Sequence, residues 1–187
     1  TAERVLIELS SFEARSFEDL FQGTLSVNWE DFIAKDEAFP VKGWALNSKL
    51  HSVPDCQSII KKAVVKRLEK VYGISYFQET DAKFPIQFAI MKDKVSVYID
   101  TTGENLYKRG YRERAVLAPM RETLASAMID ISFWRGDRPL CDPFCGSGTI
   151  PIEAALYMTN TAPGLKRNFI SETWRNIIDK EMWQDAR

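Results

Sequence analysis

The stretch DPFCGSGTIPIEAA, residues 142–155, is the feature that most constrains what this chain can fold into. It follows the short run RPLCD and precedes residues typical of a helix, so the sequence predicts a strand, a tight Gly-x-Gly turn and a helix. These three parts form the first unit of a Rossmann-type nucleotide site. The glycines let the backbone approach a ligand closely, and the free N–H groups near Thr149 face an acceptor such as a carboxylate or a ribose hydroxyl.

Three classes of ligand compete for this loop. A phosphate-binding P-loop needs a Lys directly after its second Gly, and no Lys follows Gly148. A dinucleotide loop needs a third Gly where this chain has Pro151. The sharper turn and the preceding Asp142 suit S-adenosylmethionine better, because that cofactor carries no pyrophosphate. Two other interpretations stay open: Cys145 as a nucleophile activated by the helix start, and a tight turn that holds no ligand.

Composition narrows the classes of partner and compartment. The net charge of −1 gives no general attraction to nucleic acid or membrane, so any nucleic-acid contact must come from a local patch. No apolar run approaches the roughly 18–20 residues of a membrane span, and the first residues do not resemble a secretion signal. Three cysteines argue against a disulfide framework and for a reducing cytoplasm. We expect no metal site, because Cys141 and Cys145 are too widely spaced and His51 is the only histidine.

The first hundred residues predict a helix, a strand, a helix and a hairpin. A capping pattern at Ser16 opens the first helix, and the segment from Ala38 to His51, with Pro40 near its start, reads as an edge or loop strand. The clearest helix runs from a Ser52 cap to Gly73, and its predicted buried stripe consists of Ile60, Val64, Leu68 and Val71. Residues 84–103 alternate as a hairpin around a polar KDK turn. This order predicts a small α+β unit with helices on one face of a sheet.

From Pro119 the pattern changes, which places a domain boundary near residues 105–115. A helix is predicted after Pro119, with Met120, Leu124, Met128 and Ile131 at helical intervals. The strand over 138–142, the glycine loop and the next helix follow. The final segment, SETWRNIIDKEMWQDAR, reads as an amphipathic helix carrying Trp174 and Trp183. We expect that helix to be disordered or packed against a neighbouring chain, because the chain offers it little to cover.

Four stretches in order resemble a known family. RGYR (109–112), APMRETLASAM (118–128), DPFCGSGTIPIEAA (142–155) and APGLKRNF (162–169) look like the THUMP-domain RNA methyltransferases, specifically the branch that methylates the exocyclic amino group of guanine in 23S ribosomal RNA. Residues 48–68 resemble the central part of the THUMP domain. The resemblance implies an α/β chain: a small α+β THUMP-like domain over residues 1–105, then a linker and the first units of a Rossmann-like (class I) methyltransferase domain over 106–187.

The resemblance also implies a cofactor, site residues and a partner. S-adenosyl-L-methionine would lie on the loop from Asp142 to Thr149, with the backbone of Phe144, Gly146 and Gly148 lining its methionine and ribose parts. Pro119, with Thr123 behind it, would close over the cofactor. The loop residues implicated are Asp142, Pro143, Phe144, Cys145, Gly146, Ser147, Gly148 and Thr149. Ribosomal RNA would be the partner, delivered by the THUMP part, with no membrane and no metal involved.

Two basic segments are candidates for RNA contact. Lys62, Lys66 and Lys70 recur every four residues along one helix and would neutralise phosphates, or they form a solvated face. In YKRGYRER (107–114), Arg109, Tyr111 and Arg112 would grip phosphates and stack on bases, or the arginines pair with acids in an interdomain hinge. Lys49 is a candidate by resemblance alone.

The sequence also lacks parts that the activity needs. The family holds its target amine with an Asn/Asp-Pro-Pro-aromatic motif, and no two prolines are adjacent in this chain. We therefore assign no catalytic residue and expect a fragment of a longer enzyme that is inactive by itself. The alternatives are a non-catalytic RNA-binding adaptor and a nucleotide-dependent enzyme of unrelated chemistry.

Overall fold

The computed structural model describes residues 2–74, 77, 82–112 and 119–187. The chain divides into two compact units, each described by itself. The sheet unit comprises Val5–Gly103 together with Ile170–Ala186, and the helical unit consists mainly of Glu104–Phe169. The helices of the described residues include none that is long and apolar enough to cross a membrane.

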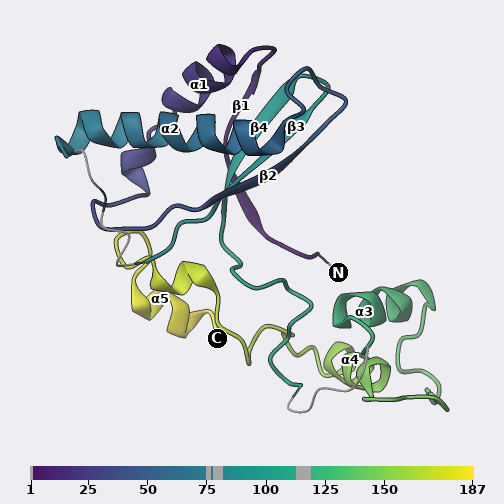
Figure 1. Ribbon diagram of the computed structural model, residues 1–187. Coiled ribbons are helices and arrows are strands. Elements are labelled where there is room, and N and C mark those ends of the chain that lie inside the picture. The colour runs from purple at the N-terminus through teal and green to yellow at the C-terminus, as the bar shows by residue number, and fades with distance from the viewer. Residues whose placement is uncertain (1, 75–76, 78–81, 113–118) are drawn as a thin grey trace. The chain divides into compact units, whose positions relative to one another are not determined.

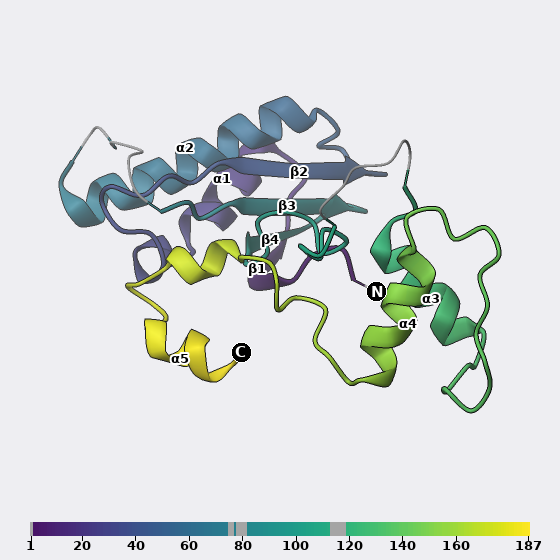
Figure 2. The same cartoon turned by 90° about the horizontal axis from the view of Figure 1, so that it is seen from below.

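The sheet unit is a four-stranded sheet with two helices packed on one face (Figures 1 and 2). Its strand order is β1-β4-β3-β2, with β2 parallel to β3 and the other neighbours antiparallel. In chain order its elements are β1 (Leu6–Glu13), α1 (Phe17–Leu25), η1 (Trp29–Asp31), β2 (Val41–Leu46), α2 (Val53–Tyr72), β3 (Ile86–Met91), β4 (Lys94–Asp100), η2 (Ile170–Thr173) and α5 (Lys180–Asp185).

Alternation along the strands builds the core of this unit. On β3, Ile86, Phe88 and Ile90 are almost fully buried, and on β4 so are Val95, Val97 and Ile99. They form one apolar cluster with Leu20 of α1 and with Ile60, Val64 and Leu68 of α2. Because successive strand residues point to opposite faces, the residues between them lie on the face away from these helices.

Local signals in the sequence predicted most of these elements correctly. Ser16 and Asp19 form the capping box of α1, with mutual side-chain to backbone bonds of 3.1 and 3.0 Å. Gly73 ends α2 in the left-handed conformation, and β2 lies at the sheet edge, as predicted. The hairpin turn falls on Lys92 and Asp93, both at positive φ.

Other predictions for this unit were wrong. Strand β1 was missed altogether. Ser52 is the N-cap of α2, as predicted, but its side chain makes no cap hydrogen bond. Val71 is 45% exposed, because Tyr72 takes the inward position in the last turn of α2 and its hydroxyl donates to the Ile33 carbonyl at 2.7 Å.

The final segment folds onto the sheet unit, contrary to the expected disorder or contact with a neighbouring chain. The Trp174 ring is 2% exposed and stacks on Phe84 with ring centroids 4.6 Å apart. Its indole N–H donates to the Lys83 carbonyl at 2.9 Å. The predicted single amphipathic helix is two short pieces, η2 and α5, and the domain division at residue 105 stays a prediction.

The helical unit contains α3 (Glu122–Ile131) and α4 (Thr149–Met158), which pack against each other. No strand forms over residues 138–142, contrary to the prediction. A strand needs a neighbour for its backbone hydrogen bonds, and every named strand in the described ranges belongs to the sheet unit. The predicted apolar stripe of α3 is at least partly exposed, with Leu124 at 53% and Ile131 at 74%.

Candidate cofactor site

The glycine loop is a series of turns that leads directly into α4. The Phe144 N–H donates to an Asp142 carboxylate oxygen at 3.2 Å, and the Gly148 N–H donates to the Cys145 carbonyl at 2.8 Å. Gly146 and Gly148 have φ of 54° and 73°, a conformation that favours glycine. The predicted Gly-x-Gly turn before a helix is therefore confirmed.

The surface of this loop is open. Pro143, Cys145 and Gly146 are exposed, and the Phe144 side chain is 93% exposed. A Cβ added at Gly146 would meet no atom within 4 Å. The loop thus presents backbone and one aromatic ring to whatever lies against it.

One arginine joins the start of α4 to the start of α3. The Arg112 guanidinium donates to the Thr149 hydroxyl at 2.9 Å and lies 3.2 Å from a Glu122 carboxylate oxygen. It also donates to the Met120 carbonyl at 3.2 Å. Thr149 is buried, and its hydroxyl lies 3.2 Å from that of Ser147. Thr149, the last residue of the glycine loop, is therefore hydrogen-bonded to an arginine that also forms an ion pair with Glu122.

A second buried network surrounds Glu153, one turn further along α4. The Tyr111 hydroxyl donates to Glu153 Oε1 at 3.0 Å, and Arg109 Nε lies 3.6 Å from the same oxygen. Arg109 and Glu153 are only 7% and 4% exposed. Burial, reinforced by the Glu153 charge, raises the pKa of the Tyr111 phenol. Tyr111 therefore stays neutral and acts as a donor.

These contacts favour the interpretation in which the arginines of residues 107–114 pair with acids. Arg109, Tyr111 and Arg112 point into the helical unit and have partners there. The partners are Glu153, Glu122 and Thr149. The sequence pattern singled out Thr149 as a loop residue but did not single out Glu153 or Glu122. Residues 113 and 114 lie outside the described residues.

The two residues predicted to close over the cofactor lie at the start of α3. Pro119 is exposed, whereas Thr123 is 5% exposed and its hydroxyl donates to a Glu3 carboxylate oxygen at 3.0 Å. The Thr123 hydroxyl thus has a partner within the helical unit.

The predicted RNA-binding lysines lie on the surface of the sheet unit. Lys62, Lys66 and Lys70 are exposed on α2, and Lys66 Nζ is 3.7 Å from Glu69. Lys66 and Lys70 line a hollow of about 590 Å³ between α1 and α2, together with Gln22, Leu25, Ser26, Arg67 and Glu69. Arg67 is tied to Glu30 by an ion pair, which lowers the pKa of Glu30.

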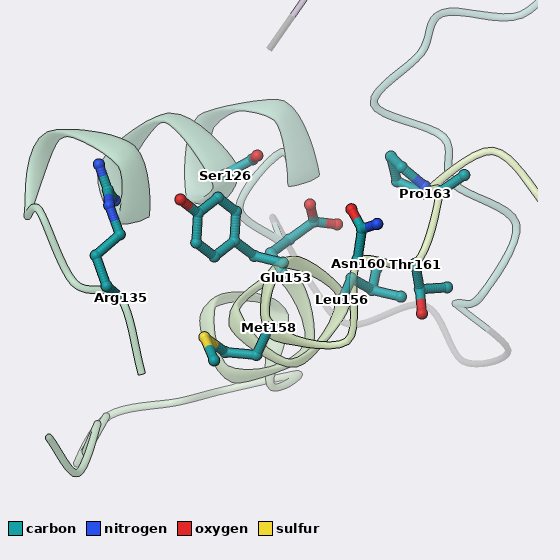
Figure 3. Close-up of a pocket in the computed structure, with 10 residues that line it drawn as sticks. Ser126, Arg135, Glu153, Leu156, Met158, Asn160, Thr161 and Pro163 are labelled. Atoms are coloured by element: carbon teal, nitrogen blue, oxygen red, sulfur yellow. The ribbon is translucent and has the colours of Figure 1, made fainter. Parts of the chain in front are cut away.

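A separate pocket of about 630 Å³ lies beside α4 (Figure 3). Ser126, Arg135, Glu153 and Asn160 are among its polar lining residues, and Figure 3 shows the Glu153 carboxylate between Ser126 and Asn160. No residue from 142 to 149 lines it. Among residues 2–74, 77, 82–112 and 119–187, no group of three His, Cys, Asp or Glu side chains could hold a metal ion.

Comparison with known families assigns both parts of the chain. Residues 14–100 match the THUMP domain model, and residues 109–187 match the model described as "RMKL-like, methyltransferase domain". The chain therefore contains a THUMP domain followed by RMKL-like methyltransferase sequence. These matches confirm the resemblance to THUMP-domain methyltransferases and the α/β fold class, whereas the guanine-specific branch stays a prediction.

Individual relatives agree with this assignment. "Putative RNA methyltransferase YpsC" of Bacillus subtilis is 45% identical over all of this chain and 49% of its own length. "Ribosomal RNA large subunit methyltransferase K/L" of Psychromonas ingrahamii is 38% identical over all of this chain and 25% of its own length. The crystal structure of SMU.472 complexed with SAH is 41% identical, with a TM-score of 0.88 over 97% of this chain and 48% of that one. The chain thus spans half or less of these relatives.

Proposed function

We propose that this chain supplies the THUMP domain and the S-adenosylmethionine loop of an RNA methyltransferase whose target is the exocyclic amino group of guanine in 23S ribosomal RNA. The observation that carries the proposal is the exposed glycine loop at the start of α4, whose last residue, Thr149, is hydrogen-bonded by Arg112. The SAH complex of a 41% identical protein supports S-adenosylmethionine as the cofactor. The relative named for ribosomal RNA supports the substrate class.

The residues of this loop fit such a cofactor. Gly146 leaves open space where a side chain would stand, and the first turn of α4 offers backbone N–H groups to an acceptor. The cofactor would lie on the backbone of Asp142–Thr149, with Pro119 and Thr123 as its predicted cover. When bound, it supplies a methyl group on a positively charged sulfur, which an amino nitrogen takes by direct displacement before losing a proton.

The part of this chain in the reaction is binding and alignment. Holding two reactants in line supplies a large share of the rate in displacement reactions. Arg112 binds both Thr149 and Glu122 and so fixes the point where the loop ends and α4 begins. The exposed Lys49, Lys62, Lys66 and Lys70 would bring the RNA backbone to the enzyme. We assign no residue of this chain to accept the proton from the amine.

A pair of glycine variants tests cofactor binding in the full-length protein. Gly146→Ala and Gly73→Ala are matched, since both glycines have positive φ and open space at Cβ. We expect Gly146→Ala to weaken S-adenosylmethionine binding at least tenfold by calorimetry, while Gly73→Ala leaves it unchanged. Equal affinity in the two variants and the wild type would contradict the assignment of the loop.

Arg112→Lys tests the bridge behind the loop. Lysine keeps the charge but cannot reach Thr149 and Glu122 with one planar group. We expect the dissociation constant for S-adenosylhomocysteine to rise about tenfold, the equivalent of one charge-assisted hydrogen bond. Arg138→Lys is the control, because Arg138 is exposed and pairs with the adjacent Asp137.

The substrate is tested by product analysis. The full-length protein is incubated with labelled cofactor and with 23S ribosomal RNA that lacks the modification, and the RNA is digested to nucleosides. N2-methylguanosine is the expected product. Label on another nucleoside would contradict the guanine assignment, and RNA binding without transfer, unaffected by added cofactor, would favour the adaptor alternative.

A further inference from the structure

The sheet unit carries an apolar and basic patch on the face away from α1 and α2. Trp44, Leu46 and Met91 are 49%, 54% and 50% exposed. On β3 the residues Phe88 and Ile90 point to the helices and are buried, so Met91 lies on the opposite face. We call Trp44, Leu46 and Met91, with the lysines around them, the open-face patch.

The strand register places these residues side by side. Trp44 is paired with Ala89, which is paired with Ser96 of β4. The next row across the same face is Leu46, Met91 and Lys94. Ala89 and Ser96 have small side chains. The large Trp44 side chain therefore has no bulky neighbour in this row on the side facing β3 and β4.

Two buried residues of the final segment pack at the other end of the strands. Trp174 packs on Phe84, just before β3 begins, and Ser171 bonds to the Thr101 carbonyl, just after β4 ends. These contacts are at the end of the strands opposite Leu46 and Met91.

The charges around the patch are mainly positive. Lys42, Lys49, Lys92 and Lys94 are all exposed. The acids nearby are Asp93, whose carboxylate accepts from the Lys49 N–H at 2.8 Å and lies 3.6 Å from Arg15, and Glu8 and Glu13 on β1. Glu13 is the register partner of Lys94, so the basic side lies over β2 and the β3–β4 turn.

We propose that the open-face patch binds single-stranded RNA, with a base stacked on Trp44 and the flanking lysines on its phosphates. Exposed aromatic rings among lysines are the general means by which proteins bind unpaired nucleotides. The lysines argue for a polyanion over a second apolar surface. This inference rests on the RNA substrate in the proposed function, and it adds a contact surface distinct from the α2 lysines.

The test measures binding of a fluorescein-labelled single-stranded RNA to the full-length protein by anisotropy. Trp44→Ala should weaken binding about 5- to 150-fold, the range for removing one stacked base contact. Trp44→Phe keeps a ring and should stay within about threefold of the wild type. Phe17→Ala is the control, since Phe17 is 41% exposed on α1, and it should change nothing.

Two further measurements separate stacking from a merely structural effect. RNA should quench tryptophan fluorescence in the wild type, and most of that quenching should vanish in Trp44→Phe. Lys42→Gln and Lys94→Gln should each lower the slope of log affinity against log salt by about 0.7.

Three outcomes would overturn the inference. Trp44→Ala could bind RNA as tightly as the wild type, Phe17→Ala could weaken binding equally, or sedimentation could show a wild-type dimer that Trp44→Ala dissolves. The last result would make the patch a contact between copies. If the wild type bound no RNA, the proposed function itself would fail. Normal cofactor affinity with unchanged RNA affinity in Trp44→Ala would remove only this patch.

Discussion

The two units of this protein have different kinds of buried side chains in their interiors. The sheet unit buries large apolar side chains, with Trp29, Phe39, Phe84 and Phe88 at most 1% exposed. Within the described residues of 104–169, the buried apolar side chains are only Ala125, Ile129 and Ala154. The buried polar ones there outnumber them: Arg109, Glu122, Thr123, Thr149, Glu153 and Arg167.

Arginines take the place of a large apolar core in the helical unit. Arg167 donates to the carbonyls of Glu104, Asn105 and Lys108 at 2.6, 2.8 and 3.1 Å. Buried ion pairs contribute little net free energy, but removing one partner is costly. The sheet unit therefore gains its stability from buried apolar surface area. The helical unit instead depends on the buried polar contacts of a few side chains, and these contacts position the glycine loop.

The largest expected effect is that of Phe88→Ala. Removing a buried aromatic ring costs about 3–5 kcal/mol in free energy of unfolding. Hydrogen exchange should accelerate first across β3 and β4, and the denaturant midpoint should fall. If the helical unit lost protection to the same degree, the two units would form a single cooperative structure and the comparison would fail.

Glu153→Ala should have the next largest effect, confined to the helical unit. It leaves the Arg109 guanidinium and the Tyr111 hydroxyl buried beside no acceptor, a change that typically costs about 3–5 kcal/mol. We expect faster hydrogen exchange in α4 and the glycine loop, with the sheet unit unchanged. Glu153→Gln keeps an oxygen for Tyr111 and should lie between the alanine variant and the wild type.

The smallest effect is a pH dependence within the sheet unit. The hydrogen bond from Arg67 lowers the pKa of Glu30 from an ordinary value of 4.5. Its contribution to stability is therefore present above pH 4.5 and is lost as pH falls through the lowered pKa. Glu30→Gln should be slightly less stable than the wild type at pH 7, and the gap in urea midpoint should close on acidification. In an Arg67→Met background the gap should be absent at both pH values.

Local signals made much of the fold predictable from the sequence. The capping box at Ser16, Gly73 after α2 and the Gly-x-Gly turn each act within a few residues of themselves. Strand β1 was not predicted because a bulge between Glu8 and Ser10 breaks its alternation of inward and outward residues. Its partner strand β4 is also distant in the sequence. The strand over 138–142 was wrongly predicted for a related reason: its own residues suit a strand, but a strand needs a partner.

The site was predictable only where its parts are contiguous. The loop from Asp142 to Thr149 was found because its glycines and the helix are adjacent in the chain. The partners of Arg109 and Arg112 were not found, since Glu153 and Thr149 lie about 40 residues further along the sequence. A row of arginines and tyrosines looks the same in sequence whether it faces RNA or a buried carboxylate.

The docking of Trp174 has a consequence for how the protein is made. Gly103 and Ile170 are neighbours in the sheet unit, and a Cβ at Gly103 would lie 3.1 Å from that of Ile170. In the sequence, the helical segment is thus inserted into the sheet unit, which the chain leaves after Gly103 and re-enters at the neighbouring Ile170. The ribosome synthesises residues 104–169 after Gly103 and before Trp174, so the sheet unit cannot complete its packing around Phe84 until the inserted segment has been made. Until then Phe84 lacks its stacking partner.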